Sequence, residues 1–382
     1  MSEPVAAIAF SETQSLCPEC LRPVSAIRFQ HGSDVYLRKT CPEHGEFQVV
    51  LWRGDPSFST WVREKIPWHP DNPATSVDRG CPFDCGLCPS HRQQTCTALI
   101  EVTTRCNLNC AFCFARSRGN KTPDLEMGEI RRMYEFLQSH AGTCNIQLSG
   151  GEPTVRDDLP EIAAMGRSMG FEFIQVNTNG LRLAADRAYA QQLKEAGVSS
   201  VFLQFDAATE KPHRTLRGTS LLQTKLDAIR VCEAHGIGVV LVPTIVPGVN
   251  DHELGHMVQL AIKYLPAVRG VHFQPVSYFG RYPKAPTDSD RITIPEILRG
   301  LEQQTGGRVT TDDFGPPGCE NARCSFHGTF VVMPDGELKA FSREADRCSC
   351  SELRAEQGAE NARRFVARQW AQPAKGSCCG KD

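Results

Sequence analysis

Hydrophobic and polar residues follow two alternating periods through the middle of the chain. Apolar runs of strand length recur, each followed by a stretch whose apolar residues return every three or four positions, as in a helix against a core. In residues 124–140, for example, Ile130, Tyr134 and Leu137 fall near one face, together with Leu125 and Met133. The predicted strands are residues 98–104, 145–153, 171–180, 198–207, 237–246 and 268–276, and the predicted helices are residues 124–140, 159–170, 186–197, 220–236 and 251–264.

This alternation over residues 98–277 predicts parallel strands joined by crossover helices. Six units are fewer than the eight of a closed barrel, so we expect an α/β fold with an open, partial (β/α)6 barrel. In such folds the chemistry gathers where the strands end. Cysteines and polar residues do follow the predicted strands in this sequence.

Composition and charge narrow the class of protein. The 382 residues are 40% hydrophobic, which is enough for a buried core, and 42 basic against 44 acidic residues give a net charge of −2. That balance gives no support to nucleic-acid binding by bulk electrostatics. No apolar run reaches the roughly 20 residues of a membrane helix, and the N-terminus does not resemble a signal peptide. We expect a cytoplasmic protein with no transmembrane segment and no nucleic-acid partner.

The 18 cysteines are the most informative residues. Without an export signal, clustered cysteines more often bind metal than form disulfides. Cys106, Cys110 and Cys113 follow the first barrel strand with the spacing C-x3-C-x2-C. Three thiolates can hold three irons of a [4Fe–4S] cluster and leave the fourth iron open to another ligand. A zinc site or an electron-transfer site is the alternative.

This loop, together with "GGEP" at residues 150–153 after the second strand, resembles the radical S-adenosylmethionine (SAM) enzymes. The resemblance implies that Cys106, Cys110 and Cys113 are catalytic, holding a [4Fe–4S] cluster whose open iron binds the amino and carboxylate groups of SAM. One electron, from a donor such as flavodoxin or ferredoxin, would cleave SAM to methionine and a 5′-deoxyadenosyl radical. That radical would abstract a hydrogen from the substrate.

The resemblance also implies which residues contact SAM. Phe112 matches an aromatic that packs on the adenine, the "GGE" turn lies near the ammonium group, and Arg217 is placed to pair with the carboxylate. Polar residues on strands three and four are expected near the ribose. The implied SAM contacts are Phe112, Gly150, Gly151, Glu152, Asn177, Asn179, Asp206 and Arg217. The alternatives are that Asn179 caps a turn and that Arg217 is a surface residue.

A second metal site is expected near the N-terminus. Cys17 and Cys20 form a "CPEC" knuckle of the rubredoxin or zinc-ribbon type, and "CPEHG" adds Cys41. Together these residues predict a mononuclear iron or zinc site. His44 is the candidate for the fourth ligand, although it could equally be a turn residue.

Two further cysteine sets predict auxiliary [4Fe–4S] clusters. The first has the spacing C-x3-C-x2-C-x7-C and comprises Cys81, Cys85, Cys88 and Cys96. The second is less diagnostic, with zinc or free thiols as alternatives, and comprises Cys319, Cys324, Cys348 and Cys350. Cys378 and Cys379 form a vicinal pair in the tail that is either redox-active or inert, whereas Cys144 and Cys232 are expected to be buried apolar residues.

These features divide the chain into four expected parts. They are a rubredoxin-like mononuclear metal lobe (1–54), an auxiliary-cluster lobe (55–97), the partial barrel (98–283) and a Cys-rich C-terminal region with a second auxiliary cluster (284–382). The barrel is thus predicted to carry metal-binding extensions at both ends.

Separate blocks over residues 15–283 are similar to the tetraether lipid synthase class, and the chain departs from that class after about residue 285. The resemblance implies a rubredoxin-like iron, auxiliary clusters and radical coupling of lipid carbons, while other members are linked to methylation of a pterin-type cofactor. No amphipathic docking helix favours a lipid. We therefore predict carbon–carbon bond formation or alkylation, including methylation, at an unactivated carbon of a lipid-like, cofactor or small-molecule substrate.

Two other functions remain open from the sequence. The first is oxidation or C–S or C–C cross-linking of a peptide or small molecule with the help of auxiliary clusters. The second is electron transfer without catalysis, against which "GGEP" and the barrel both argue.

Overall fold

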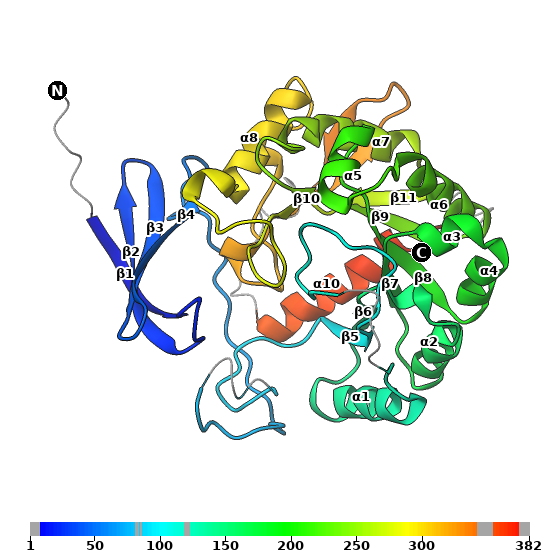
Figure 1. Ribbon diagram of the computed structural model, residues 1–382, viewed down its shortest axis with the longest axis horizontal. Coiled ribbons are helices and arrows are strands. Elements are labelled where there is room, and N and C mark those ends of the chain that lie inside the picture. The colour runs from blue at the N-terminus through cyan, green and yellow to red at the C-terminus, as the bar shows by residue number, and fades with distance from the viewer. Residues whose placement is uncertain (1–7, 81–83, 85, 118–122, 342–353, 374–382) are drawn as a thin grey trace.

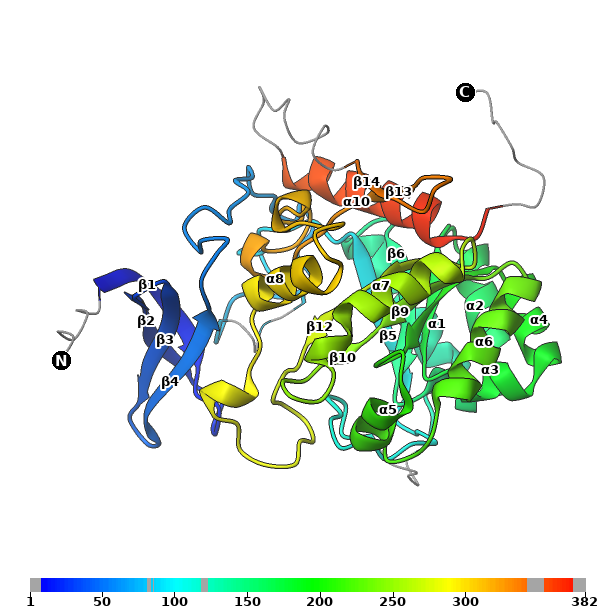
Figure 2. The same ribbon diagram turned by 90° about the horizontal axis from the view of Figure 1, so that it is seen from above.

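The computed structural model describes residues 8–80, 84, 86–117, 123–341 and 354–373. Figures 1 and 2 show a small antiparallel sheet at the N-terminal end, set to one side of a larger α/β unit that contains the cysteine loop. Among these residues no helix combines the length and the apolar character that crossing a bilayer requires.

The larger unit is built on a parallel sheet of six described strands in the order β11-β9-β8-β7-β6-β5. Helices join successive strands and lie around the outside of the sheet (Figure 1). The predicted α/β fold with a partial (β/α)6 barrel is confirmed. The strands are β5 (Thr97–Thr103), β6 (Asn145–Gly150), β7 (Ile174–Thr178), β8 (Val198–Gln204), β9 (Gly238–Val242) and β11 (Val268–Val271). The helices are α1 (Met127–His140), α2 (Leu159–Ser168), α3 (Leu181–Ala185), α4 (Arg187–Glu195), α5 (Glu210–Arg217), α6 (Leu222–Ala234) and α7 (Leu254–Lys263).

The sheet has two different faces because alternate residues of a strand point in opposite directions. On one face Gln147 donates a hydrogen bond to Gln175 at 2.8 Å, and Gln175 donates to Ser200 at 3.1 Å. The residues of the other face are apolar and fully buried in the main core: Ile146, Leu148, Ile174, Val176, Val201, Leu203, Val239 and Leu241. Burial of this apolar face against the helices is the main force that stabilises the unit.

The last two predicted strands are each interrupted. β9 is followed by the two-residue β10 (Thr244–Ile245), and β11 by β12 (Gln274–Pro275); β10 and β12 pair in parallel as a separate ladder. Pro243 has no N–H to donate, but its carbonyl accepts a hydrogen bond from the Gln274 amide at 2.9 Å. The interruption carries Thr244 and Gln274 beyond the end of the main sheet.

The N-terminal region contains more regular structure than the sequence indicated. It forms an antiparallel meander, and Val24 and Ala26 alternate with exposed neighbours on its second strand. Trp52 and Trp61, which follow, pack on Leu298 of helix α8 (Ile294–Gln304) and join this region to the rest. The strands are β1 (Ile8–Leu16), β2 (Pro23–His31), β3 (Asp34–Cys41) and β4 (Gly45–Trp52).

Two helices beyond the barrel were not predicted, namely α8 (Ile294–Gln304) and α10 (Ala355–Trp370). A short hairpin, β13 (Phe330–Val332) with β14 (Leu338–Ala340), lies between them in the chain. α10 crosses the N-terminal ends of the barrel strands. A Cβ at Gly238 would lie 1.9 Å from the Trp370 carbonyl oxygen, and the Trp370 ring stacks on Phe202 with centroids 5.5 Å apart. α10 therefore closes the barrel opposite the cysteine loop.

The buried face of the sheet leads to a prediction about stability. Leu148→Ala removes a fully buried side chain and should lower the free energy of unfolding by about 2–5 kcal/mol, measured by chemical denaturation. Leu99→Ala is the matched control, since Leu99 lies on the edge strand β5 and is 50% exposed. Its effect should stay within about 0.5 kcal/mol. Equal losses in the two variants would contradict the assignment of the two faces.

Candidate functional site

The cysteine loop lies directly after β5, and backbone contacts from distant segments hold it. The Ala111 amide donates to the Leu216 carbonyl at 3.0 Å. Cys113 and Arg281 exchange two backbone hydrogen bonds of 2.9 and 2.8 Å, as neighbouring strands do. The Arg281 side chain adds hydrogen bonds to the carbonyls of Cys110 and Ser117 at 2.8 and 2.9 Å. The loop is thus held in one conformation from both sides.

Close backbone packing makes a glycine necessary beside Arg281. A Cβ at Gly280 would lie 2.3 Å from the Phe114 oxygen and 2.4 Å from the Cys113 oxygen, and its φ of +73° favours glycine. Neither Gly280 nor Arg281 was predicted from the sequence to have a role in the site. The available signal was the "FGR" segment, which follows the last strand and ends in a glycine and a cation.

The glycine turn after β6 packs equally closely on the start of the cysteine loop. A Cβ at Gly150 would lie 2.1 Å from the Thr103 oxygen, and one at Gly151 would lie 2.1 Å from the Arg105 oxygen. Amides of the same turn donate to those two carbonyls, from Gly151 at 2.9 Å and from Glu152 at 2.8 Å. Glycine at both positions allows this approach.

Glu152 ties the ends of β6 and β7 together. Its buried carboxylate accepts hydrogen bonds from the Thr154 amide and hydroxyl at 3.1 and 2.6 Å, the Thr178 hydroxyl at 2.7 Å and the Asn179 amide at 2.6 Å. Burial raises the pKa of Glu152, although these donors act to lower it. The carboxylate therefore orders the strand ends, and its predicted contact with the ammonium group of SAM remains a prediction.

Asp206 and Arg217 form a buried ion pair behind the loop. Arg217 Nε and Nη2 donate to the two carboxylate oxygens of Asp206 at 2.8 and 2.6 Å, and Nη2 also donates to Thr244 Oγ1 at 3.1 Å. Burial acts to lower the pKa of Arg217, but the charge of Asp206 and the nearby Cys110 together raise it above its usual value. Arg217 is therefore not a surface residue, and its carboxylate partner among the described residues is Asp206.

The two asparagines after β7 differ in their surroundings. Asn179 donates to Asn107 Oδ1 in the cysteine loop at 2.7 Å, and its own Oδ1 accepts from the Leu181 amide at 3.0 Å. Asn177 Oδ1 is buried and finds no hydrogen-bond partner among the described residues. An orphaned acceptor at the strand ends fits a site that receives a polar ligand.

Lys225 is a buried cation that was not predicted from the sequence. Its Nζ donates to the Asn179 carbonyl at 2.9 Å and to the Gln204 carbonyl at 2.5 Å. Burial lowers its pKa to about 8. The sequence could have indicated its burial, because Lys225 precedes Ala228 by three positions and Ile229 by four and so shares their face of α6.

The three thiols suit a cationic cluster. Burial raises the pKa of Cys106 to about 11, and the nearby charges of Glu152, Cys110 and Cys113 act in the same direction. Thiolates gathered here are stable only beside a compensating cation. The donor set therefore fits an iron–sulfur cluster held by Cys106, Cys110 and Cys113.

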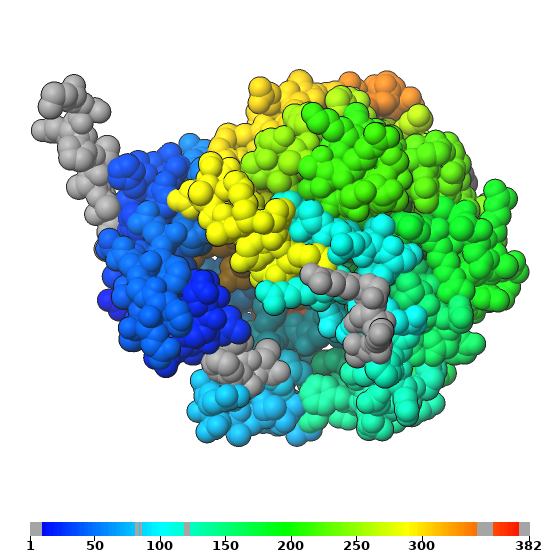
Figure 3. Space-filling model, viewed as in Figure 1, coloured from blue at the N-terminus to red at the C-terminus, as the bar shows by residue number. Residues whose placement is uncertain are grey.

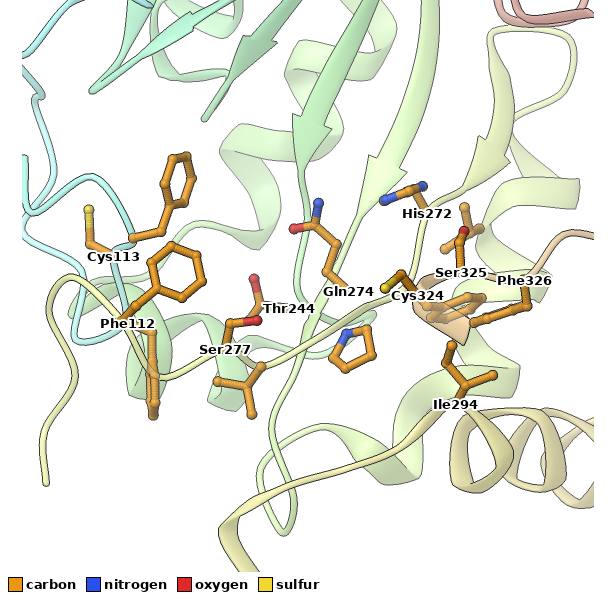
Figure 4. Close-up of a pocket in the computed structure, with 16 residues that line it drawn as sticks. Phe112, Cys113, Thr244, His272, Gln274, Ser277, Ile294, Cys324, Ser325 and Phe326 are labelled. Atoms are coloured by element: carbon orange, nitrogen blue, oxygen red, sulfur yellow. The ribbon is translucent and has the colours of Figure 1, made fainter. Parts of the chain in front are cut away.

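A cavity of about 470 Å³ opens beside this loop. Figure 4 shows Phe112 and Cys113 at one end, Cys324 at the other, and Gln274 between them. Thr244, whose hydroxyl accepts a hydrogen bond from Arg217, also lines it. The cavity thus connects the cysteine loop to the C-terminal region.

The fold places the four candidate metal ligands of the N-terminal region close together. The candidate ligand atoms of Cys17, Cys20, Cys41 and His44 all lie within 4.8 Å of one another. His44 Nδ1 is 3.5 Å from the sulfur of Cys41 and 3.7 Å from that of Cys17. His44 is therefore placed as a fourth ligand in this arrangement, which suits a tetrahedral ion.

The remaining cysteines are only partly described. Cys81, Cys85, Cys348, Cys350, Cys378 and Cys379 lie outside the described residues. Cys96 lies against Cys319, and their hydrogen bond lowers the pKa of Cys96. This contact joins members of two sets that the sequence kept apart, so the predicted auxiliary clusters stay predictions. Cys144 and Cys232 are buried in the core, as expected.

Comparisons with known proteins bear on the same residues. Residues 100–261 match the Radical SAM superfamily, and residues 9–53 match the HMPTM N-terminal zinc ribbon domain. A 7,8-dihydro-6-hydroxymethylpterin dimethyltransferase of Methanocaldococcus jannaschii is 43% identical over 308 residues, which are 80% of this chain and 61% of that protein. This chain thus spans less than two thirds of that relative.

A probable GTP 3′,8-cyclase of Archaeoglobus fulgidus is 30% identical over 260 residues, covering 63% of this chain and 83% of that protein. Among solved structures, methylornithine synthase matches with a TM-score of 0.44 and 18% identity, over 74% of this chain and 84% of that one. That structural similarity is too low to inform the site.

The buried ion pair leads to a second prediction. Asp206→Ala leaves the Arg217 cation without its partner in the interior and should cost about 3–5 kcal/mol in free energy of unfolding. Asp227→Ala is the control, since Asp227 pairs with Arg230 at 2.6 Å where both side chains are about half exposed. Its cost should be at most about 1 kcal/mol. Chemical denaturation of the metal-free chain measures both, and a small loss for Asp206→Ala would contradict the account.

The N-terminal site leads to a third prediction, which concerns metal content. Cys17→Ala should remove the single ion bound there, from about one per chain to nearly none. The count of iron expected at the cysteine loop should be unchanged, because that loop belongs to another part of the fold. Cys144→Ala, a buried thiol outside both sites, is the control. Elemental analysis by mass spectrometry gives the counts, and an unchanged count in Cys17→Ala would contradict the ligand set.

Proposed function

This chain belongs to the radical SAM superfamily, and we propose that it methylates an unactivated carbon of a small, pterin-like molecule. The observation that carries the proposal is the cavity of about 470 Å³ that opens directly beside the cysteine loop. Its volume lies within the range of about 300–1,000 Å³ that is usual for small-molecule sites. The pterin comes from the name of the Methanocaldococcus jannaschii relative at 43% identity.

In the proposed site, Cys106, Cys110 and Cys113 hold a [4Fe–4S] cluster, and SAM lies between that cluster and the strand ends. Bound together, they supply a 5′-deoxyadenosyl radical by one-electron cleavage of SAM. Gly150 and Gly151 leave space for the cofactor by packing closely on the start of the loop.

Other residues orient SAM in this proposal. Phe112, at the end of the cavity, contacts the adenine. The unpartnered Asn177 Oδ1 accepts a hydrogen bond from a ribose hydroxyl, and Asn179 lies beside it. Because Asp206 already engages two nitrogens of Arg217, we propose that the carboxylate of SAM takes only the remaining donor capacity of this guanidinium.

The extensions contribute further metal in this proposal. The zinc ribbon match over residues 9–53 favours zinc at Cys17, Cys20, Cys41 and His44 over the iron that the sequence left open. The two remaining cysteine sets hold auxiliary iron–sulfur clusters. A flavodoxin or ferredoxin supplies the electron. The division of the chain into four parts, which end at residues 54, 97, 283 and 382, belongs to the same proposal.

The size of the cavity also bears on the substrate class. A compact ring suits the volume better than the paired chains of a tetraether lipid, so the lipid-coupling reaction predicted from resemblance is the less favoured form of carbon–carbon bond formation. Within the described residues, no feature favours oxidation or cross-linking of a peptide.

The test is anaerobic reconstitution with iron and sulfide, followed by reduction and addition of SAM and 7,8-dihydro-6-hydroxymethylpterin. Mass spectrometry should detect 5′-deoxyadenosine, a methylated pterin and S-adenosylhomocysteine, because SAM is the only methyl donor in this assay. Replacing Cys106, Cys110 and Cys113 together with alanine should abolish all of these products, because the cluster loses its ligands. Cys144→Ala should retain them. A wild-type protein that forms 5′-deoxyadenosine but leaves the pterin unmethylated would contradict the proposed reaction.

A further inference from the structure

The cavity beside the cysteine loop has an unusual lining. Sixteen described residues surround it, and none is Asp, Glu, Lys or Arg. His272, one of the lining residues, is held neutral because burial lowers its pKa to about 4. A ligand that carries phosphates requires cationic partners. The lining therefore favours an uncharged ligand.

The mouth of the cavity presents two exposed aromatic rings. Phe114 and Phe279 are each 56% exposed, and their centroids lie 6.3 Å apart. Gly280 keeps them together, since its backbone packs on the Phe114 carbonyl where no Cβ fits. The two rings are inclined by 53°, so a flat ring that stacks on one of them meets the other at an angle, and both contacts remove apolar surface from water. This favours an aromatic ligand.

Polar groups reach into the cavity from the short ladder that Pro243 separates from the main sheet. The side chain of Gln274, which is exposed, extends toward the centre, and its side-chain carboxamide has no partner in the described part of the chain (Figure 4). An amide both donates and accepts, so it can pair with a ring edge that does the same. Thr244 Oγ1 accepts its hydrogen bond from Arg217, which leaves its hydroxyl hydrogen to donate. Both groups lie between Cys113 and Cys324.

We infer that this cavity binds an uncharged, flat heteroaromatic ring, with Gln274 pairing to its amide-like edge and the inclined rings of Phe114 and Phe279 contacting its apolar surface. Gln274 is then a specificity-determining residue. The inference rests on the proposed function for the location of the chemistry, and it adds which residues recognise the substrate. The inference also distinguishes the substrate named for the pterin dimethyltransferase from the one named for the GTP cyclase. The phosphates of GTP would find no charged side chain in this lining.

The experiment measures dissociation constants by calorimetry on the anaerobically reconstituted full chain, with a 7,8-dihydropterin and with GTP as probes. Gln274→Ala and Phe279→Ala should each weaken dihydropterin binding about tenfold or more, because hydrogen bonds or ring contacts are lost. Gln303→Ala, an exposed glutamine on α8, and Phe341→Ala, a ring that is 57% exposed, are matched controls and should bind as the wild type does. GTP should neither bind in the cavity nor compete.

Three results would overturn the inference: no dihydropterin binding by the wild type, unchanged binding by both cavity variants, or competition by GTP. Failure of the proposed function looks different. Dihydropterin binding that depends on Gln274, without a methylated product, leaves the inference standing and refutes the methylation. A methylated product formed equally well by Gln274→Ala refutes the inference alone. Formation of 5′-deoxyadenosine by each variant shows that it folds with an intact cluster loop.

Discussion

The close backbone packing around the cysteine loop is the constraint on which the rest of the site depends. Gly150 and Gly151 press on its start, and Gly280 and Arg281 pair with its end. Each contact requires two chain segments that are far apart in the sequence, so the loop takes its conformation only when the barrel is complete. These backbone hydrogen bonds hold the segment that carries the cysteines, which reduces the ordering cost of binding a cluster.

The same arrangement joins the loop to the cavity through buried charge. Arg217 connects Asp206 to Thr244, and Thr244 lines the space where we place the substrate. A buried ion pair contributes little net stability compared with apolar packing, but it specifies one geometry because any other leaves a charge unpaired. Pro243 adds to this by separating a short ladder from the sheet. The strand ends therefore present polar groups at defined positions around an otherwise apolar cavity.

The sequence predicted those parts of the molecule in which local pattern and structure agree. The period of apolar residues identified the barrel, and the three-cysteine spacing identified the loop, since both are visible within a few residues. The strands of the N-terminal sheet were not predicted, because only alternate positions such as Val24 and Ala26 are buried in this thin lobe. The roles of Lys225 and Arg281 were not predicted, because both side chains donate hydrogen bonds to carbonyls that are distant in the sequence. The contact between Cys96 and Cys319 likewise depends on tertiary structure, and spacing alone assigned those cysteines to different sets.

The central claim is that three cysteines hold a cluster with one open iron, and electron paramagnetic resonance tests it most directly. Spectra of the dithionite-reduced protein are recorded with and without SAM, and the variant lacking Cys106, Cys110 and Cys113 provides the background of any other cluster. We predict a reduced [4Fe–4S] signal that is present only in the wild type and whose g-values shift when SAM binds. A wild-type signal that SAM leaves unchanged would mean that all four irons already have protein ligands, and it would contradict the account.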